Sequence, residues 1–106
     1  MTKRVRESIL ELREQLGRLY GDRLRGLILY GSYARGDADE GSDIDLLVVV
    51  DDFEDADAEY ARISPVACEI SLKHDVVISC ILYREDEYRR WNTPLLLNVR
   101  REGVPV

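Results

Sequence analysis

The sequence predicts a small α/β (α+β) fold, in which a mixed β-sheet of three or more strands is flanked by helices. Apolar residues near the amino terminus recur at intervals of three and four, which is typical of a helix. Three later segments are short apolar runs rich in branched residues, which are typical of buried strands. The 106 residues have room for one modest core, so we expect a single domain over residues 1–106.

The first predicted element is an amphipathic helix that ends at Gly21. Its apolar positions form one stripe: Val5, Ile9, Leu12, Leu16 and Leu19. The apolar run 26–30 stops at Gly31 and is too short for such a helix, so it is predicted as the first strand. A polar segment from Gly31 to Ser42 leads to the second strand, predicted over 43–50. This segment is too short for a parallel crossover, so the two strands are expected to be antiparallel.

The second half of the chain alternates again between the two patterns. Residues 54–73 have helical spacing, and Pro65 in their middle predicts a kink or two abutting helices. The run 75–83 is predicted as the third strand, and a short charged helix follows over 85–91. A last helix is predicted to open at Thr93-Pro94 and to close at Gly103.

Two aspartates stand at the start of the second strand. Because side chains alternate along a strand, Asp43 and Asp45 are expected on one face and Ile44 on the other. Two carboxylates ~4 Å apart repel by roughly 4 kcal/mol at an effective dielectric near 20, and a divalent cation would offset this. Hard oxygen ligands suit magnesium, which also accepts phosphate oxygens. The pair therefore predicts a magnesium site.

Three further residues are expected around this pair. Asp75 begins the third predicted strand, and we take its carboxylate as the third metal ligand at the same edge of the sheet. Gly31 lets the backbone approach a phosphate closely, and Ser32 offers a hydroxyl and an amide at the start of a short helical turn. Gly31 and Ser32 are therefore expected to hold a triphosphate.

These residues resemble the signature of the DNA polymerase β-like nucleotidyltransferase superfamily. That signature is Gly-Ser, a spacer, Asp-x-Asp on one strand and an acidic residue on a later strand. The match here is Gly31-Ser32 followed by Asp43-Ile44-Asp45. The chain is similar to the minimal nucleotidyltransferases of bacteria and archaea, which implies the nucleotidyltransferase fold.

The resemblance also implies cofactors and a partner. Two magnesium ions would bridge the carboxylates and the triphosphate of ATP or another nucleoside triphosphate. Asp43 and Asp45 would bind both ions, and Asp75 would ligate the catalytic one and help to deprotonate the acceptor. Many similar small proteins are antitoxins that adenylylate a HEPN-domain ribonuclease toxin on tyrosine. A hydroxyl on a partner protein is therefore the expected acceptor.

Two other polar residues of the loop are assigned to nucleotide binding, each with an alternative left open. Arg35 is placed to reach a phosphate, although an arginine in a polar loop is as often a surface charge. Ser42 either touches the substrate or orients the loop. The loop acids Asp37, Asp39 and Glu40 are expected to keep the loop solvated and are left out of the site.

Composition limits the partners and the compartment. A net charge of −6 gives the surface no general attraction for a phosphate backbone, which disfavours free nucleic acid as a partner. No apolar stretch approaches the ~20 residues of a membrane span, and the basic amino terminus lacks the apolar run of a secretory signal. Cys68 and Cys80 are expected to be reduced core residues in a cytoplasmic protein. The oligomeric state stays open, a homo-oligomer included.

We therefore expect a metal-dependent enzyme that moves a nucleotide, AMP from ATP in the first instance, to a hydroxyl on a partner such as a HEPN-type toxin. Two rivals remain open. The chain is either a non-enzymatic antitoxin or binding partner with a relict site, or a small-molecule nucleotidyltransferase of the aminoglycoside type. Retained carboxylates argue against the first rival, and the absence of an additional helical domain argues against the second.

Overall fold

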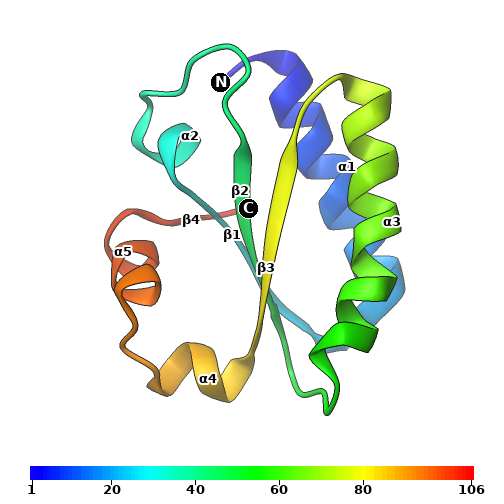
Figure 1. Ribbon diagram of the computed structural model, residues 1–106, viewed down its shortest axis with the longest axis vertical. Coiled ribbons are helices and arrows are strands. Elements are labelled where there is room, and N and C mark those ends of the chain that lie inside the picture. The colour runs from blue at the N-terminus through cyan, green and yellow to red at the C-terminus, as the bar shows by residue number, and fades with distance from the viewer.

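A computed structural model describes residues 1–106 as a four-stranded mixed sheet with helices on both faces (Figure 1). The elements in chain order are α1 (Lys3–Tyr20), the 3-10 turn η1 (Gly21–Arg23), β1 (Leu24–Tyr30), α2 (Ser32–Arg35), β2 (Ile44–Val50), α3 (Ala56–His74), β3 (Ile78–Arg84), α4 (Glu85–Arg90), α5 (Pro94–Glu102) and β4 (Val104–Pro105). None of these helices combines the length and the apolar character needed to cross a membrane.

The strands lie in the order β3-β2-β1-β4. Strands β1 and β2 are antiparallel, and β2 and β3 are parallel, so the predicted mixed sheet and the predicted pairing of the first two strands are confirmed. The final strand β4 pairs antiparallel with β1 through two residues, and the sequence analysis did not predict it. This sheet brings the end of β1 and the beginnings of β2 and β3 to one edge of the molecule (Figure 1).

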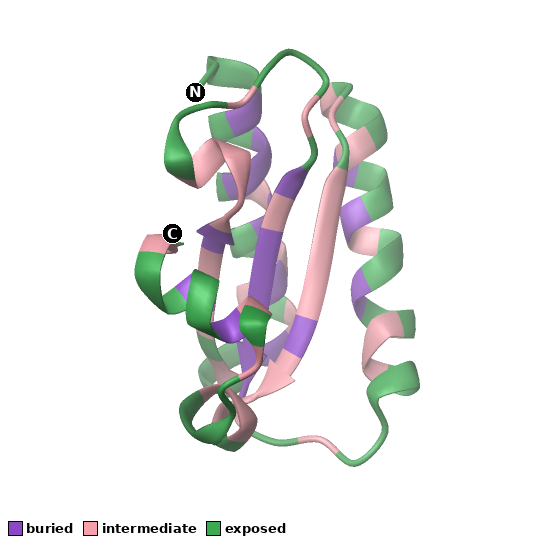
Figure 2. Cartoon of the chain, turned by 60° about the vertical axis from the view of Figure 1, so that its left-hand side comes forward, coloured by how far each residue is buried: buried purple, intermediate pink, exposed green.

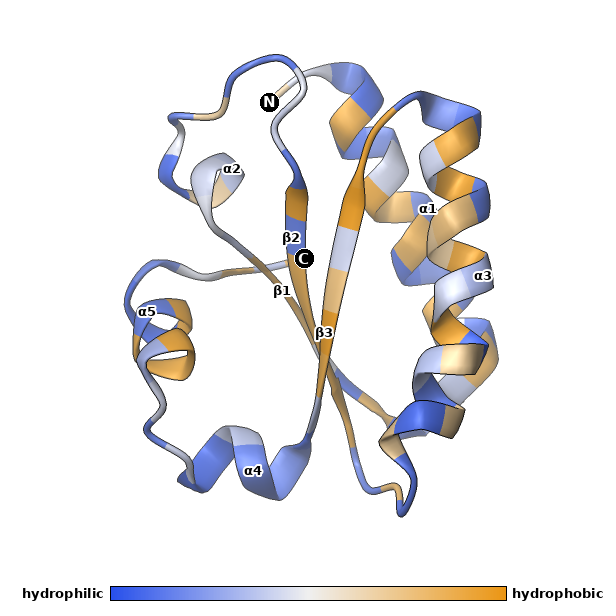
Figure 3. Ribbon diagram, viewed as in Figure 1, coloured by the Kyte–Doolittle hydropathy of each residue, from blue (hydrophilic) through white to orange (hydrophobic).

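Two apolar cores cover the two faces of the sheet. The larger one packs α1 and α3 against one face and includes Leu12, Ile44 and Ile63, each at most 1% exposed. The smaller one packs α5 against the other face through Leu96 and the β2 residue Leu47. In Figures 2 and 3, the buried and apolar positions of α1 and α3 face the sheet, and their polar positions face outward. Strand β2 is thus buried on both faces, which explains its nearly continuous apolar sequence.

The first helix follows the sequence prediction closely. The hydroxyl of Thr2 caps its start by accepting a hydrogen bond from the Val5 amide at 3.2 Å. Its end is Gly21, whose φ of 56° favours glycine. Of the predicted stripe, all residues but the partly buried Leu19 are at most 3% exposed. Local spacing therefore sufficed to identify both this helix and the face that it buries.

The structure corrects the second half of the predicted pattern in three places. Residues 56–74 form one α-helix with the exposed Pro65 inside it, not two abutting helices. The third strand begins at Ile78, three residues later than predicted. Cys68 lies on the exposed face of α3, so the prediction of two core cysteines is wrong for Cys68, whereas Cys80 on β3 is partly buried.

Parts of both sheet edges are protected from pairing with another strand. On the β3 edge, the amide of Ile78 donates to Ser71 Oγ at 3.3 Å, and the amide of Leu82 donates to Tyr60 Oη at 2.8 Å. On the β4 edge, Pro105 has no amide hydrogen to donate. Side chains of α3 thus occupy hydrogen-bonding groups that an edge strand would otherwise offer to a second chain.

Candidate active site

The candidate site begins at the turn that joins β1 to the short helix α2. Gly31 has a φ of 75°, and its carbonyl accepts a hydrogen bond from the Arg35 amide at 3.1 Å. A Cβ atom built on Gly31 would collide with Oδ2 of Asp45. Glycine is therefore required here both by the backbone angle and by the carboxylate that lies against the turn. The turn also presents the Ser32 hydroxyl and amide at the start of α2.

Asp43 and Asp45 flank the first residue of β2. Ile44 between them is fully buried in the larger core, whereas Asp45 is half-buried and Asp43 is exposed. Burial raises the pKa of Asp45, the charge of Asp43 raises it further, and the charge of Arg35 opposes both. The charge of Asp43 thus acts on the Asp45 carboxyl. The predicted shared face of the two carboxylates stays a prediction.

Two residues lie beside Asp45 in the sheet. In the strand register, Asp45 is paired with Tyr30 on β1 and with Ser79 on β3. Paired residues on neighbouring strands project to the same face, so both side chains accompany the carboxylate. Burial raises the pKa of Tyr30 to about 12, and the charge of Asp45 contributes to this shift. Tyr30 is therefore a neutral phenol at physiological pH.

Arg35 is held at the end of α2 by two carboxylates. Its Nε donates to Asp37 Oδ2 at 3.3 Å, and its Nη1 donates to Glu102 Oε1 at 3.2 Å. Both partners raise the pKa of the guanidinium, the Asp37 hydrogen bond most strongly. Because Arg35 also lowers the pKa of Asp45, its charge is within electrostatic reach of the aspartate pair.

Ser42 organises the loop that leads to the aspartates. Its hydroxyl accepts a hydrogen bond from the Asp39 amide at 2.9 Å, and its own amide donates to the Asp39 carbonyl at 3.0 Å. Of the two alternatives for Ser42, this geometry matches orientation of the loop. The reciprocal bonds fix the turn immediately before Asp43.

The position of Asp75 differs from the prediction. Asp75 is not on the third strand, but ends α3 in the left-handed conformation with a φ of 54°. The next amide, from Val76, bonds to the Ser71 carbonyl and completes a helix-closing turn. The Asp75 side chain is 99% exposed, and its nearest charged partner is Arg4 on α1 at 3.9 Å. The strand was predicted to start at Asp75 because an apolar run follows this residue directly. The turn at Asp75 delays the strand to Ile78, and no glycine in the sequence marks this turn.

The site therefore brings together two carboxylates, not three. No group of three or more histidine, cysteine, aspartate or glutamate side chains is arranged to hold a metal ion. Burial and the charge of Asp43 raise the pKa of Asp45, and the charge of Arg35 only opposes them. Two carboxylates with open positions nevertheless suit magnesium, which retains waters and takes its other ligands from substrate phosphates.

Comparison with known proteins identifies the family. A family model described as a nucleotidyltransferase domain matches residues 9–98 of the chain. The chain belongs to the nucleotidyltransferase domain family. A protein of Methanocaldococcus jannaschii named as a protein adenylyltransferase is 40% identical to it over 100 residues, which are 94% of this chain and 96% of the relative. The chain is thus a nucleotidyltransferase enzyme, as the signature predicted.

Solved structures show the same fold. A crystal structure of a toxin–antitoxin with AMP-PNP matches this nucleotidyltransferase with a TM-score of 0.64 and 23% identity, over 98% of this chain and 72% of the other. A complex from Shewanella oneidensis, between a tri-AMPylated HEPN toxin and an MNT antitoxin, matches with a TM-score of 0.55 and 21% identity, over 92% of this chain and 70% of the other. The predicted nucleotidyltransferase fold is confirmed.

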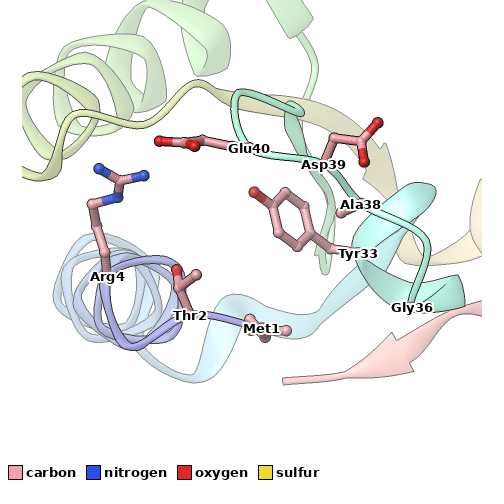
Figure 4. A pocket seen from close by; sticks show the side chains of 8 residues that line it. All are labelled: Met1, Thr2, Arg4, Tyr33, Gly36, Ala38, Asp39 and Glu40. Atoms are coloured by element: carbon pink, nitrogen blue, oxygen red, sulfur yellow. The ribbon is translucent and has the colours of Figure 1, made fainter.

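A pocket of about 540 Å³ lies beside this site but does not include the aspartates. It is formed between the first turn of α1 and the loop after α2, and Figure 4 shows the Tyr33 ring between these two walls. The remaining lining residues are Met1, Thr2, Arg4, Gly36, Ala38, Asp39 and Glu40. Tyr33 packs against the larger core, whereas Asp45 lies on the face opposite Ile44. The aspartate pair and the Gly31 turn, and not this pocket, are therefore taken as the candidate site of this nucleotidyltransferase.

Three residues of the site were missed by the sequence analysis. Tyr30 and Ser79 become neighbours of Asp45 only through the strand register. A signal for Tyr30 was present, since it precedes the Gly-Ser turn directly. Glu102 lies 67 residues from Arg35 in the chain, and no local pattern marked it.

Proposed function

We propose that this nucleotidyltransferase transfers AMP from ATP, with magnesium, to a hydroxyl group on a partner protein. We propose further that the partner is a HEPN-type toxin, so that the modification gives the chain an antitoxin role in the cytoplasm. The nucleotidyltransferase activity follows from the family, and the metal, the donor and the acceptor are the subject of this proposal.

One observation carries the metal and nucleotide part of the proposal. The half-buried carboxylate of Asp45 lies against the Gly31 turn, next to Asp43, at a position that only a glycine permits. Burying a carboxylate beside a second one costs free energy unless a cation compensates both. A magnesium ion accompanied by phosphate oxygens is the compensation that fits two carboxylates beside a backbone turn.

The proposed roles follow from this arrangement. Asp43 and Asp45 would hold magnesium, and the two ions implied by the resemblance would share this pair. The Gly31–Ser32 turn would bind the triphosphate through backbone amides and the Ser32 hydroxyl. Arg35 would contact phosphate oxygens, and Ser42 would support the loop around them. We do not assign a role in the reaction to Asp75, because its carboxylate is directed to solvent near Arg4.

The reaction is a substitution at the α-phosphorus of ATP. The acceptor hydroxyl oxygen forms a bond to this phosphorus, the bond to the bridging oxygen breaks, and pyrophosphate leaves with the electron pair. The hydroxyl proton is released to water. Bound magnesium would neutralise charge on the triphosphate and on the departing pyrophosphate. The chain itself aligns the triphosphate between the turn and Arg35, so that the α-phosphorus faces the acceptor.

Two relatives support a protein acceptor. The M. jannaschii relative, at 40% identity, is named as a protein adenylyltransferase. The S. oneidensis structure contains a HEPN toxin that carries AMP groups, in complex with an MNT antitoxin of the same fold. A HEPN-domain protein from the same genome is therefore the acceptor to test first.

The decisive experiment follows the α-phosphate. The purified chain is incubated with magnesium, the HEPN-domain protein encoded nearest to it, and ATP labelled on either the α- or the γ-phosphorus. We expect label on the HEPN protein from α-labelled ATP alone. Asp43→Ala should reduce the rate at least about 100-fold, as expected when a ligand of a catalytic ion is removed.

Asp22→Ala is the matched control, because Asp22 is exposed in η1 at the opposite end of β1. This variant should transfer label as fast as the unmodified chain. Transfer from γ-labelled ATP, or transfer that persists in Asp43→Ala, would contradict the proposal. Tight binding of the HEPN protein without transfer or nucleotide binding would instead support the non-enzymatic alternative.

A further inference from the structure

The carboxyl-terminal helix contributes a charged group to the candidate site. Helix α5 ends at Glu102, and the next residues pair with β1 as strand β4. A Cβ atom on Gly103 would meet the Val99 carbonyl and the Ile28 side chain, so the chain turns tightly at this point. This turn holds Glu102 beside β1, with its side chain only 21% exposed.

Glu102 and Asp37 hold Arg35 from two sides. They occupy Nη1 and Nε of the guanidinium, while Nη2 makes no hydrogen bond within the chain. An arginine side chain loses rotamer freedom when a ligand has to fix it. Because Glu102 is anchored on α5, it fixes Arg35 before any ligand arrives, and Nη2 stays free to bind an anion.

The aspartate pair makes this restraint important. Arg35 ends the one-turn helix that starts at Gly31, and Asp45 lies against Gly31, so a released guanidinium would be attracted to Asp43 and Asp45. It would then occupy the carboxylates that are proposed to hold magnesium. Glu102 competes with these carboxylates for the guanidinium, because it already accepts a hydrogen bond from Arg35 Nη1.

We propose that Glu102 is a positioning residue, which fixes the Arg35 guanidinium for the triphosphate and keeps it away from Asp43 and Asp45. The inference rests on the proposed function and extends the nucleotide site to a residue of α5. A residue that merely linked α5 to α2 would not affect nucleotide binding through Arg35. As a positioning residue, Glu102 should affect nucleotide binding only through Arg35.

The test is a double-mutant cycle on nucleotide affinity. The ligand is the non-cleavable ATP analogue with a methylene group between the α- and β-phosphorus, titrated with magnesium by calorimetry. Glu102→Gln should weaken binding about five- to tenfold, the effect of one charge-assisted hydrogen bond. In the Arg35→Ala background, Glu102→Gln should cause no further change. An unchanged affinity in Glu102→Gln, or an equal loss in both backgrounds, would overturn the inference.

Glu11→Gln is the matched control, because Glu11 also joins two distant elements through ion pairs but lies on α1, away from the site. It should leave the affinity unchanged. Glu102→Asp keeps the charge, should bind within about twofold of the unmodified chain, and carries the test if Glu102→Gln does not fold. A loss in Glu102→Asp as large as in Arg35→Ala would contradict the inference.

The two proposals fail in different ways. An unmodified chain that does not bind the analogue would overturn both of them. Binding without label transfer to any HEPN protein would contradict only the proposed acceptor. Binding that depends on Arg35 but not on Glu102 would contradict only the role of Glu102.

Discussion

Gly31 connects the backbone to the chemistry of the site. Its φ of 75° and the carboxylate of Asp45 both exclude a side chain at this position. Gly31→Ala should lower the free energy of unfolding by about 1–3 kcal/mol, the cost of a left-handed non-glycine residue, measured by urea denaturation. The variant should also lose affinity for magnesium and ATP, because Asp45 must move.

Gly17 in α1 provides the control, since a Cβ atom there would meet nothing within 4 Å. Gly17→Ala should stabilise the chain by up to about 1 kcal/mol through higher helix propensity. If Gly31→Ala were as stable as Gly17→Ala, the proposed contact between the turn and Asp45 would be wrong.

Asp45 should destabilise the chain in metal-free buffer at neutral pH. Its pKa is raised in the fold, so the folded state binds more protons than the unfolded state between the ordinary value of 3.8 and the raised folded value. Stability attributable to this group is therefore present at lower pH and is lost as the pH rises through the folded pKa. Asp45→Asn should be more stable at pH 7 by less than about 1 kcal/mol, because water screens a half-buried charge.

This difference should disappear below pH 3.8. Thermal unfolding with a chelator present, across a series of pH values, measures it. A variant that is less stable than the unmodified chain at pH 7 would show that the carboxylate is already compensated within the fold.

Among the single residues, the sequence predicted those parts of the candidate site that follow from local geometry. The alternation along β2 placed Asp43 and Asp45 on one face, and the Gly-Ser turn was recognised from adjacent residues. Asp75 was misplaced because an aspartate can end a helix in the left-handed conformation without a glycine to mark the turn. Ser79 instead occupies the strand position beside Asp45.

Among the elements, α3 carries a proline in its middle. Pro65 has no amide hydrogen, so it cannot bond to the carbonyl of Ala61, and its exposed ring makes little compensating contact. Pro65→Ala should restore this bond and raise the free energy of unfolding by about 1–3 kcal/mol, measured by urea denaturation. A loss of stability would indicate that the proline stabilises the packing of α3 on the sheet.

Ion pairs also join helices α1 and α3. Glu11 accepts a hydrogen bond from Lys73 Nζ at 2.7 Å and lies 2.6 Å from His74 Nε2. These partners, Lys73 first, lower the pKa of Glu11 from its ordinary 4.5. The contacts of Glu11 with Lys73 and His74 therefore stabilise the fold above pH 4.5. This contribution is lost as the pH falls through the lowered pKa of Glu11 in the folded state.

Glu11→Gln should accordingly be less stable than the unmodified chain at pH 7 and equally stable in strong acid. Thermal unfolding at several pH values measures the difference. A difference that persists below the folded pKa would assign the effect of the substitution to packing instead of charge.

The elements with strong local signals were predicted well. Helix α1 has a clear apolar stripe, and α5 has Thr93 and Pro94 at its start and Gly103 after its end. The helix containing Pro65 was predicted to kink or to divide because a proline is a local break signal, whereas the packing of Ile63 and Ala67 on the sheet keeps the helix continuous. Strand β4 has only two residues and depends on β1 for its existence, so no local pattern predicts it.

For the whole molecule, the sheet order decides what the site contains. Because β4 returns beside β1, helix α5 ends close to the Gly31 turn, and Glu102 meets Arg35. The mixed sheet and the antiparallel first pair were predictable from the short connection between the strands. The contact between residues 35 and 102 was not, because it depends on how distant segments pack together. Asp45 lies on the face of the sheet that carries the smaller of the two cores, because Leu47 and Val49 follow it at alternate positions of β2.

We propose that Asp43 and Asp45 bind ATP together with magnesium. Calorimetric titration of the purified chain with ATP, with and without magnesium, tests it most directly. We predict binding that requires magnesium, weakens at least about tenfold in Asp45→Ala, and is unchanged in Asp75→Ala. Magnesium-independent binding, or an affinity that Asp75→Ala reduces and Asp45→Ala does not, would contradict the claim.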